Sequence, residues 1–278
     1  MVRDTDLPSQ DAVRTVAAAH SSVPVRLALV TEPGFMPPIC RGIQEAKGDV
    51  VAFLDDDAEA EPGWTSGLLR AYSSPAVGGA GGRCINMDRD REIPVPETSR
   101  VGYLSAWGKL VGNHFLRPAF HSPLDVDYLM GGCMSFRTSV ARELEFDWAL
   151  NRNVATGYEV DLGLQVRRSG HRIIFDPAVA IRHFGGPRAI AGNRDPLDEV
   201  AAEATAYNLT RIVLARAPGS KRAAFILRQF TLGERRAPGL LPWIASPLSR
   251  RLGFLTALGK AATRGRFQAI RDHLRRAR

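Results

Sequence analysis

Hydrophobic and polar positions in the first two hundred residues form short apolar runs separated by longer amphipathic stretches. Residues 50–54 are an uninterrupted apolar run, which is typical of a strand buried on both faces in a parallel sheet. The same patterns predict further strands over residues 25–30, 134–136, 173–175 and 179–181, and helices over residues 39–47, 63–72 and 160–168. Strands that alternate with helices predict an α/β fold in which helices cover a central sheet.

Two segments depart from this alternation. The glycine-rich residues 78–82 predict a backbone that lies in close contact with its neighbours. Residues 86–127 are rich in proline and lack a clear period, so we expect them to run over the sheet as an irregular excursion.

From about residue 197 the pattern becomes helical and basic. The 278 residues carry 37 Lys and Arg against 29 Asp and Glu, a net charge of +8. Residues 201–278 hold 16 of the basic residues and three acidic ones, a net charge of +13, so residues 1–200 carry −5. We therefore predict a domain over residues 1–195 and a basic helical extension over residues 196–278.

Composition excludes several classes of protein. With 45% hydrophobic and 24% charged residues, the chain is neither a disordered polymer nor a bundle embedded in a membrane. It has no uncharged span of about 18 residues that could cross a bilayer, and its polar first residues predict no secretory signal. Cys40, Cys84 and Cys133 form no CxxC pair, so we expect ordinary thiols in a reducing cytoplasm.

Asp55, Asp56 and Asp57 directly follow the apolar run of residues 50–54. Ligands of open α/β sheets bind at the carboxyl ends of strands, and adjacent carboxylates repel one another unless a cation is present. Mg²⁺ and Mn²⁺ take oxygen ligands from protein carboxylates and from substrate phosphates. The triplet therefore predicts a metal–diphosphate site, and the alternative is a solvated acidic turn before the next helix.

Residues 48–64, with this triplet at their centre, resemble the central segment of family 2 glycosyltransferases of the GT-A fold. The resemblance implies a Rossmann-like mixed α/β sheet flanked by helices, with the basic helical extension attached at its C-terminal end. In that family the first Asp of the DxD motif lies near the ribose of the nucleotide sugar, and the last coordinates the metal that bridges the diphosphate. The resemblance thus assigns Asp55 to the nucleoside and Asp57 to Mg²⁺ or Mn²⁺, with Asp56 between them in the donor site.

Residues 157–172 resemble the Gly-Glu-Asp-Val-Asp-Leu segment of the same family, in which the Asp after Glu is the catalytic base. Glu159 occupies the position of the base, and Tyr158 replaces the preceding Glu. A carboxylate there takes the proton of the acceptor hydroxyl as the hydroxyl attacks the anomeric carbon. The alternative is that Glu159 and Asp161 are acids favoured at a helix N-terminus by the helix dipole.

Residues 173–186 resemble the final strand of the family, which ends in a His that can join the metal site. The resemblance makes His183 a candidate ligand through a neutral imidazole, and the alternative is a structural His. Residues 131–137 match the strand before the catalytic helix, whose backbone lines the acceptor side in the family; the alternative is a tight turn into a core strand.

The beginning of the chain departs from the family pattern. Family members open with a strand of the type Val-Ser-Val-Val-Ile-Pro-Thr-Tyr-Asn, whereas Met1–Asp6 resembles the end of their second strand. The resemblance then places Asp4 or Asp6 near the base of the nucleotide. We expect a sheet without its first strand to have an open edge, and a start codon assigned too far downstream would explain this. Ile39 and Cys40 stand where the family has Arg-Asn.

Apolar residues recur at helical spacing in the extension, and arginines surround them: Leu248, Leu252, Leu255 and Leu258, then Phe267, Ile270 and Leu274. This pattern predicts either an amphipathic helix that lies on an anionic membrane surface or a helical cap on the preceding domain. The extension has no recognisable nucleic-acid motif, so we predict no nucleic-acid partner.

The sequence as a whole predicts a metal-dependent, inverting glycosyltransferase with a nucleotide-sugar donor and a glycan or polyisoprenoid-linked acceptor. We expect it in the cytoplasm or peripherally on the inner face of the cell membrane. One alternative is a degenerate, non-catalytic GT-A domain that serves as a membrane-associated scaffold. Another is a nucleotidyltransferase, which would not explain the segments that contain Glu159 and His183.

Overall fold

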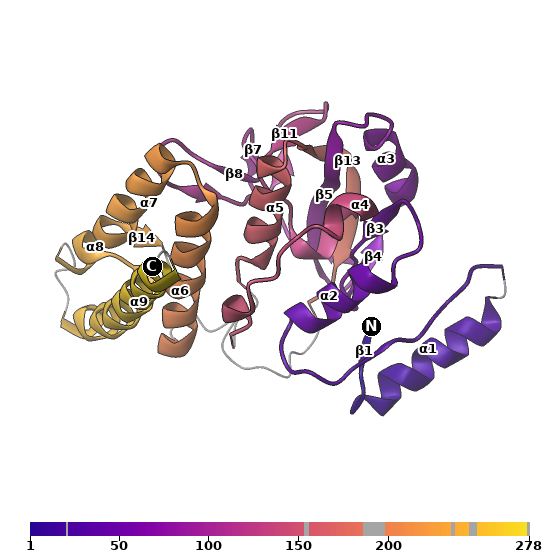
Figure 1. The fold of residues 1–278 in the computed structure, drawn as a ribbon, viewed down its shortest axis with the longest axis horizontal. Helices are drawn as coiled ribbons and strands as arrows, with labels where there is room; N and C mark the ends of the chain where they lie inside the picture. Colours follow the sequence, from indigo (N-terminus) through magenta and orange to yellow (C-terminus); the bar gives the residue numbers. More distant parts are fainter. Residues whose placement is uncertain (21, 153–155, 186–197, 235–236, 245–248, 277–278) are drawn as a thin grey trace.

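The computed structural model describes residues 1–20, 22–152, 156–185, 198–234, 237–244 and 249–276 (Figure 1). A seven-stranded mixed sheet forms its centre. Five of its strands lie side by side in this order: β11 (Leu124–Val126), β13 (Arg172–His183), β5 (Val77–Asp88), β12 (Met134–Arg137) and β3 (Val50–Ala52). Two short strands complete it, since β4 (Ala58–Ala60) pairs with β13 and β6 (Arg91–Glu92) pairs with β5.

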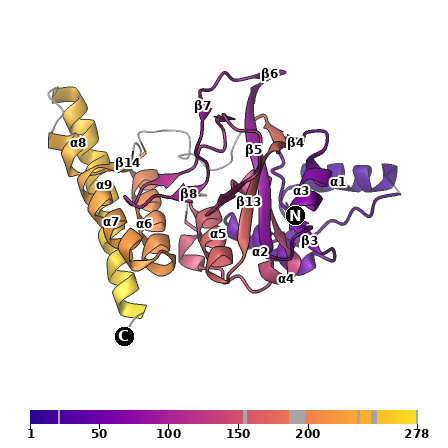
Figure 2. The same cartoon turned by 90° about the horizontal axis from the view of Figure 1, so that it is seen from above.

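Helices cover both faces of this sheet. Alternate residues of β13 point to opposite faces, so Ile173 and Phe175 pack in the core cluster that contains residues of α5 (Tyr158–Arg168). Ile174 packs instead with residues of α3 (Trp64–Ala71). Figure 2 shows α3 and α5 on the two sides of β5 and β13. The predicted Rossmann-like mixed sheet flanked by helices is therefore confirmed.

Two strand predictions were wrong in detail. The apolar run of residues 50–54 is a strand only over β3, and Leu54 is exposed. β3 is not a doubly buried strand with parallel neighbours, because it lies at the end of the strand order, pairs antiparallel with β12 and has Ala52 exposed. The Phe53 N–H still donates a hydrogen bond to Met134 O at 2.8 Å, and the acidic turn begins two residues later. The two strands expected over residues 173–175 and 179–181 form one strand, β13, with an irregularity between Asp176 and Ala180.

The N-terminal segment stands apart from the main sheet. β1 (Val2–Arg3) pairs in parallel with β2 (Leu29–Val30), and α1 (Leu7–Ala19) connects them. The strand expected over residues 25–30 is thus only β2. Within the described residues, β3 pairs with β12 on one side and with no strand on the other, so this edge of the sheet is open.

The close backbone contact expected for residues 78–82 is confirmed in β5. A Cβ atom on Gly82 would lie 1.7 Å from Val179 O, and one on Gly81 would lie 2.2 Å from Cys133 O. The irregularity in β13 brings the Val179 carbonyl over β5, so only glycine fits at position 82. These contacts allow β13 and β5 to pair along most of their length.

The remaining helices and strands lie around this core. α2 (Met36–Glu45) begins three residues earlier than the helix expected over residues 39–47. The excursion over residues 86–127 contains short strands: β7 (Glu97–Thr98), β8 (Tyr103–Leu104), β9 (Leu110–Val111) and β10 (Arg117–Pro118). Between β12 and α5 lie α4 (Thr138–Ala141) and a single helical turn at Trp148–Leu150, and a further turn at Gly131–Cys133 precedes β12.

The extension consists of helices and one small hairpin. In chain order it contains α6 (Glu199–Arg216), α7 (Gly219–Thr231), β14 (Gly233–Glu234), β15 (Ala237–Pro238), α8 (Leu240–Ile244) and α9 (Ser249–Arg276). α6 packs on the body, because Ile212 lies in one cluster with Val160 and Leu164 of α5. Ion pairs also hold α6 in place: Arg216 pairs with Asp161 of α5, and Arg211 pairs with Asp147, which precedes the helical turn at Trp148–Leu150.

The face of α9 that packs on α6 differs from the predicted leucine and phenylalanine stripes. Beside Leu258, which packs with Ala202 of α6, small buried residues form most of it: Ala261, Ala262, Gly265 and Ala269. A Cβ atom on Gly265 would lie 2.2 Å from Glu203 O, so the two helix backbones approach closely. Small side chains permit this approach, and they make α9 a cap on α6.

Some of the apolar residues predicted in the extension are buried, and others are exposed to solvent. Leu258 is buried, whereas Phe267 and Leu274 are each 59% exposed. Leu248 lies outside the described residues, and the side chains of Leu252 and Leu255 are likewise not described. α9 therefore packs on α6 and also presents apolar side chains to solvent.

We predict that Gly82→Ala lowers the free energy of unfolding by about 2–3 kcal/mol, because the new Cβ atom overlaps Val179 O and separates β13 from β5. Urea denaturation measures this change. The matched control is Gly259→Ala in α9, where a Cβ atom meets nothing within 4 Å. It should raise stability by about 0.5–1 kcal/mol through better helix propensity. An unchanged urea midpoint for Gly82→Ala would contradict the prediction.

Candidate active site

The pairing of β4 with β13 brings Asp57 and His183 together. Ala58 is the register partner of His183 in this antiparallel pair, so the preceding residue, Asp57, lies beside the imidazole. The Phe184 N–H also donates to Asp57 O at 2.9 Å. The His183 Nε2 atom then lies 3.3 Å from Asp57 Oδ1 and 4.0 Å from Asp55 Oδ2.

Asp55, Asp57 and His183 form a cluster that fits a divalent cation. Each offers one ligand atom, and these atoms all lie within 4.8 Å of one another. Asp57 and His183 are partly buried and Asp55 is exposed, so the cluster opens to solvent on the side of Asp55. Two carboxylates and one imidazole suit Mn²⁺ or Mg²⁺, with further positions left for water and phosphate oxygens.

A Gly-Gly turn lies between this cluster and the start of α5. A Cβ atom on Gly132 would lie 2.5 Å from Asp55 Oδ2, and one on Gly131 would lie 2.0 Å from Tyr158 Oη. The turn predicted before β12 is therefore present, and its backbone faces both acidic segments of the sequence. Tyr158 stacks at a tilt on Phe35, with ring centroids 5.2 Å apart.

Glu159 lies in the first turn of α5, after Gly157, whose φ of 92° is in the left-handed region. Burial raises the pKa of the Glu159 carboxyl to about 7; backbone hydrogen bonds oppose the shift and the charge of Asp55 adds to it. Glu159 Oε2 is buried and has no hydrogen-bond partner among the described residues. The carboxyl is thus poised to exchange a proton near neutral pH.

Asp161 lies in the same first turn of α5, where it is buried and makes a structural contact. Its carboxylate accepts hydrogen bonds from Arg216 Nε at 2.9 Å and from Gln165 Nε2 at 2.8 Å. Burial raises its pKa, and the charge of Arg216 acts against that increase. Sequence reasoning missed Arg216, because 55 residues separate it from Asp161 and no local pattern marks the pair.

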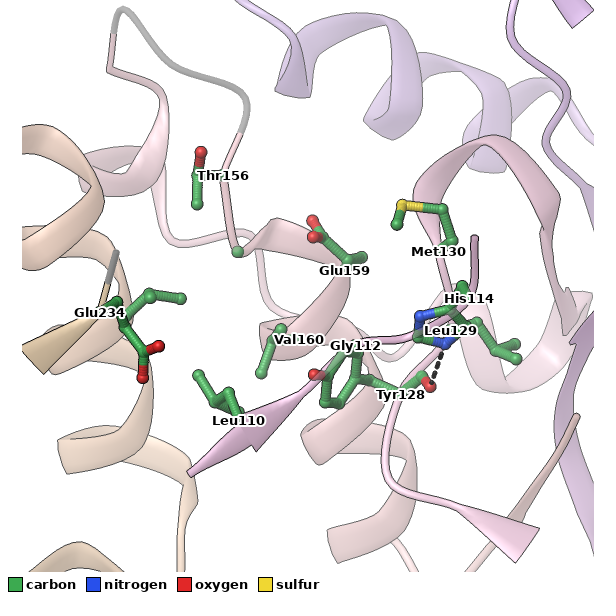
Figure 3. A pocket seen from close by; sticks show the side chains of 12 residues that line it. Leu110, Gly112, His114, Tyr128, Leu129, Met130, Thr156, Glu159, Val160 and Glu234 are labelled. Atoms are coloured by element: carbon green, nitrogen blue, oxygen red, sulfur yellow. Dashed lines mark hydrogen bonds between the residues drawn. The ribbon is translucent and has the colours of Figure 1, made fainter. Parts of the chain in front are cut away.

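A cavity of about 210 Å³ lies next to Glu159 (Figure 3). Its wall includes His114, whose Nε2 atom lies 3.2 Å from Tyr128 O. Burial lowers the pKa of His114 to about 4, so the ring is neutral. Glu234 of β14 forms another part of the wall. Sequence reasoning missed Glu234 as well; the available signal was that it is one of only three acidic residues in the strongly basic residues 201–278.

Three of the residues predicted to bind the donor are not part of the cluster of Asp55, Asp57 and His183. Asp6 caps α1, because its side chain accepts a hydrogen bond from the Ser9 N–H at 3.1 Å. Asp4 is exposed after β1, and its N–H donates to Val30 O. Asp56 is exposed in the turn between β3 and β4. Their contact with a nucleotide stays a prediction.

None of the helices that the structure describes combines the length and apolar character needed to cross a membrane.

The family model described as "Glycosyltransferase like family 2" matches residues 3–195. This match spans more than half of the chain, so the protein belongs to the family 2 glycosyltransferases. The mixed sheet and the cluster of Asp55, Asp57 and His183 agree with this class of glycosyltransferase, as the resemblance implied. No curated protein matches the sequence.

Solved structures of similar fold include three glycosyltransferases. GalNAc-T7 with UDP, GalNAc and Mn²⁺ has a TM-score of 0.57 and 14% identity, over 92% of this chain and 46% of that one. Residues 1–349 of TarS from S. aureus with UDP-GlcNAc have a TM-score of 0.53 and 13% identity, over 94% and 70%. Mannosyltransferase PcManGT from Pyrobaculum calidifontis with GDP-Man and Mn²⁺ has a TM-score of 0.53 and 16% identity, over 95% and 75%. At these identities the likeness concerns the fold, and this chain spans about half the length of the first.

We predict that Asp57→Asn and His183→Ala each weaken Mn²⁺ binding at least about tenfold, because each removes one of three ligand atoms. Calorimetry with Mn²⁺ alone measures the affinity. The control is Glu59→Gln, which removes an exposed carboxylate of β4 that pairs with Arg182 at 3.5 Å. Equal Mn²⁺ affinities for all three variants and the wild type would show that the cluster is not the cation site.

Proposed function

We propose that the protein moves a sugar from a nucleoside diphosphate to a hydroxyl of a glycan or polyisoprenoid-linked acceptor, with inversion at the anomeric carbon. One observation supports this most strongly: a buried carboxyl with a pKa near 7 lies close enough to the metal-type cluster to be affected by the charge of Asp55. In this proposal Glu159 is the base on the acceptor side of one reaction centre, and the cluster is the cation site on its diphosphate side.

Asp57 and His183 are the residues that would hold Mg²⁺ or Mn²⁺, with Asp55 at the third ligand position. The cation supplies charge neutralisation for the departing diphosphate. In this proposal the nucleoside is bound by Asp55 and Asp56, together with Asp4 or Asp6. The match of residues 3–195 to the family model supports the assignment of these segments to donor binding.

Glu159 acts as the base of a single displacement. The acceptor oxygen forms a bond to the anomeric carbon while the bond from that carbon to the diphosphate oxygen breaks, and the hydroxyl proton passes to Glu159. Attack and departure occur on opposite sides of the carbon in one step, so the configuration inverts. In this scheme the proton is accepted by Glu159 Oε2, which has no hydrogen-bond partner among the described residues.

The extension gives the enzyme a membrane-facing surface in this proposal. Phe267 and Leu274 lie two helical turns apart on α9, and the ring of Phe230 on α7 contacts Phe267 at 5.2 Å between centroids. The side chains of Arg264 and Arg271 are also exposed on α9. Apolar side chains among basic ones suit an anionic lipid surface, where polyisoprenoid-linked acceptors lie. In this proposal the protein acts in the cytoplasm, bound peripherally to the inner face of the membrane.

We predict that Glu159→Gln lowers kcat/KM by about 10²–10⁴-fold while donor binding persists, because the amide cannot accept the hydroxyl proton. Nucleotide release from UDP-, GDP- and dTDP-sugars with Mn²⁺ measures turnover. The base must be ionised, so wild-type kcat/KM should fall as pH decreases through about 7. Glu143→Gln changes an exposed carboxylate that lines neither the cavity nor the cluster; it is the control and should leave both quantities unchanged.

The non-catalytic alternative predicts a different result in the same assay. A scaffold would release no nucleotide from any of these donors in the wild type, and it would bind no nucleotide with Mn²⁺ in calorimetry. Either nucleotide release or an effect of Glu159→Gln excludes it.

We predict that the wild type binds vesicles containing phosphatidylglycerol and not vesicles of phosphatidylcholine alone, and that Phe267→Asp with Leu274→Asp lowers binding at least about tenfold. Vesicle flotation measures the bound fraction. Leu69→Asp is the matched control, because Leu69 on α3 has the same 59% exposure. A loss caused equally by Leu69→Asp would contradict a membrane surface on α9.

A further inference from the structure

The cavity beside Glu159 contains two buried polar atoms without partners. Glu159 Oε2 and His114 Nδ1 are both buried, and neither has a hydrogen-bond partner among the described residues. Both side chains line this cavity, and Figure 3 shows them on its wall. Buried polar atoms are nearly always hydrogen-bonded, so two orphaned atoms in one cavity point to a ligand with hydroxyl groups.

The rest of the wall is largely apolar. Its apolar side chains come from several elements that are distant in the sequence: Leu110, Leu129, Met130, Val160 and Leu209. A pyranose ring combines an apolar face of C–H groups with hydroxyls at its edge, and this combination matches an apolar wall with a few polar atoms. The cavity volume of about 210 Å³ suits one such ring.

The charge of the wall is one-sided. Glu159 and Glu234 line the cavity, and no Lys or Arg among the described residues does; residues 235 and 236 lie outside that part of the chain. Two side chains contact the Oε1 atom of Glu234: Arg228 at 3.5 Å and Gln229 Nε2 at 3.2 Å. Among the described residues, a ligand carboxylate or phosphate in the cavity would therefore face two carboxyl groups and no basic side chain of the wall, because Arg228 meets Glu234 from outside the lining residues.

The extension holds Glu234 in this wall. Glu234 pairs with Ala237 in the β14–β15 hairpin. Arg266 of α9 is buried and donates hydrogen bonds to the carbonyl oxygens of Ala237 and Pro238. Gly233, with a φ of 68°, leaves no room for a Cβ atom because Gly239 N would lie 2.3 Å from it. The position of this carboxylate thus depends on packing between α9 and the hairpin.

We propose that this cavity binds the sugar ring of the acceptor as a neutral or cationic pyranose, and that Glu234 determines specificity by rejecting pyranoses that carry a carboxylate or phosphate. The proposal rests on the proposed transferase function, in which the acceptor hydroxyl meets Glu159. His114 Nδ1 and Glu159 Oε2 bind ring hydroxyls, and the apolar residues pack on the ring face. A basic extension thereby contributes an acidic residue to the acceptor side of the site.

Saturation-transfer NMR on the full chain tests the proposal with methyl glycosides of glucose, galactose, mannose and N-acetylglucosamine, and with the uronates and 6-phosphates of the three hexoses. At pH 6 most Glu159 is protonated, so the measured charge effect reports Glu234. We expect at least one neutral hexoside to bind at least about tenfold more tightly than its anionic counterparts. Glu234→Gln should reduce this ratio to below about threefold, and Glu234→Asp should preserve it.

Glu199→Gln is the control, because Glu199 is an exposed acid at the start of α6. Circular dichroism verifies the folding of each variant, and Glu234→Gln keeps the acceptor oxygen for Gln229. Binding of no hexoside, equal binding of neutral and anionic ones, or an unchanged ratio in Glu234→Gln overturns the proposal. Calorimetry of nucleotide and Mn²⁺ binding on the same sample separates the outcomes. If the sample binds nucleotide and Mn²⁺ but does not discriminate between neutral and anionic hexosides, only the acceptor inference is wrong. If it binds no nucleotide, the proposed transferase function is wrong as well.

Discussion

The pairing of β13 with β5 along its length, and with β4 at its end, is the constraint on which the rest of the site depends. Nine register pairs align β13 with β5, and the backbone at Gly82 accommodates the irregularity in β13. At the end of this strand the register with β4 places His183 beside Asp57. Two residues that are 126 positions apart in the sequence become neighbours because both are attached to one hydrogen-bonded ladder.

The second acidic segment is positioned from the other side. α5 lies between the sheet and α6, and the buried Asp161 of α5 pairs with Arg216 of α6. Removing one partner of a buried ion pair leaves an uncompensated charge and costs about 3–5 kcal/mol. The extension is therefore part of the scaffold that fixes the orientation of α5 and of Glu159 at its start, and the hairpin that carries Glu234 extends the same packing to the cavity.

The charges of the two parts of the chain have separate roles in this arrangement. The acidic cluster concentrates negative charge where a cation fits, and the charge of Asp55 contributes to the raised pKa of Glu159. A cation bound at the cluster would offset that contribution and favour the ionised base. Part of the positive charge of the extension lies on exposed arginines of α9, such as Arg264 and Arg271, whereas the charged side chain that the extension contributes to the cavity wall is the carboxylate of Glu234.

The sequence by itself determined the fold class and the members of both acidic segments, because apolar period and residue type are local properties. It also determined that glycines 81 and 82 meet neighbouring backbone. Only the tertiary structure decided that Asp55 joins Asp57 and His183, that β3 lies at the end of the strand order, and that small residues form the buried face of α9. The roles of Arg216 and Glu234 also follow only from the tertiary structure, because they depend on contacts between segments far apart in the chain. Pairing register and helix packing set those contacts, and no local pattern of side chains records either of them.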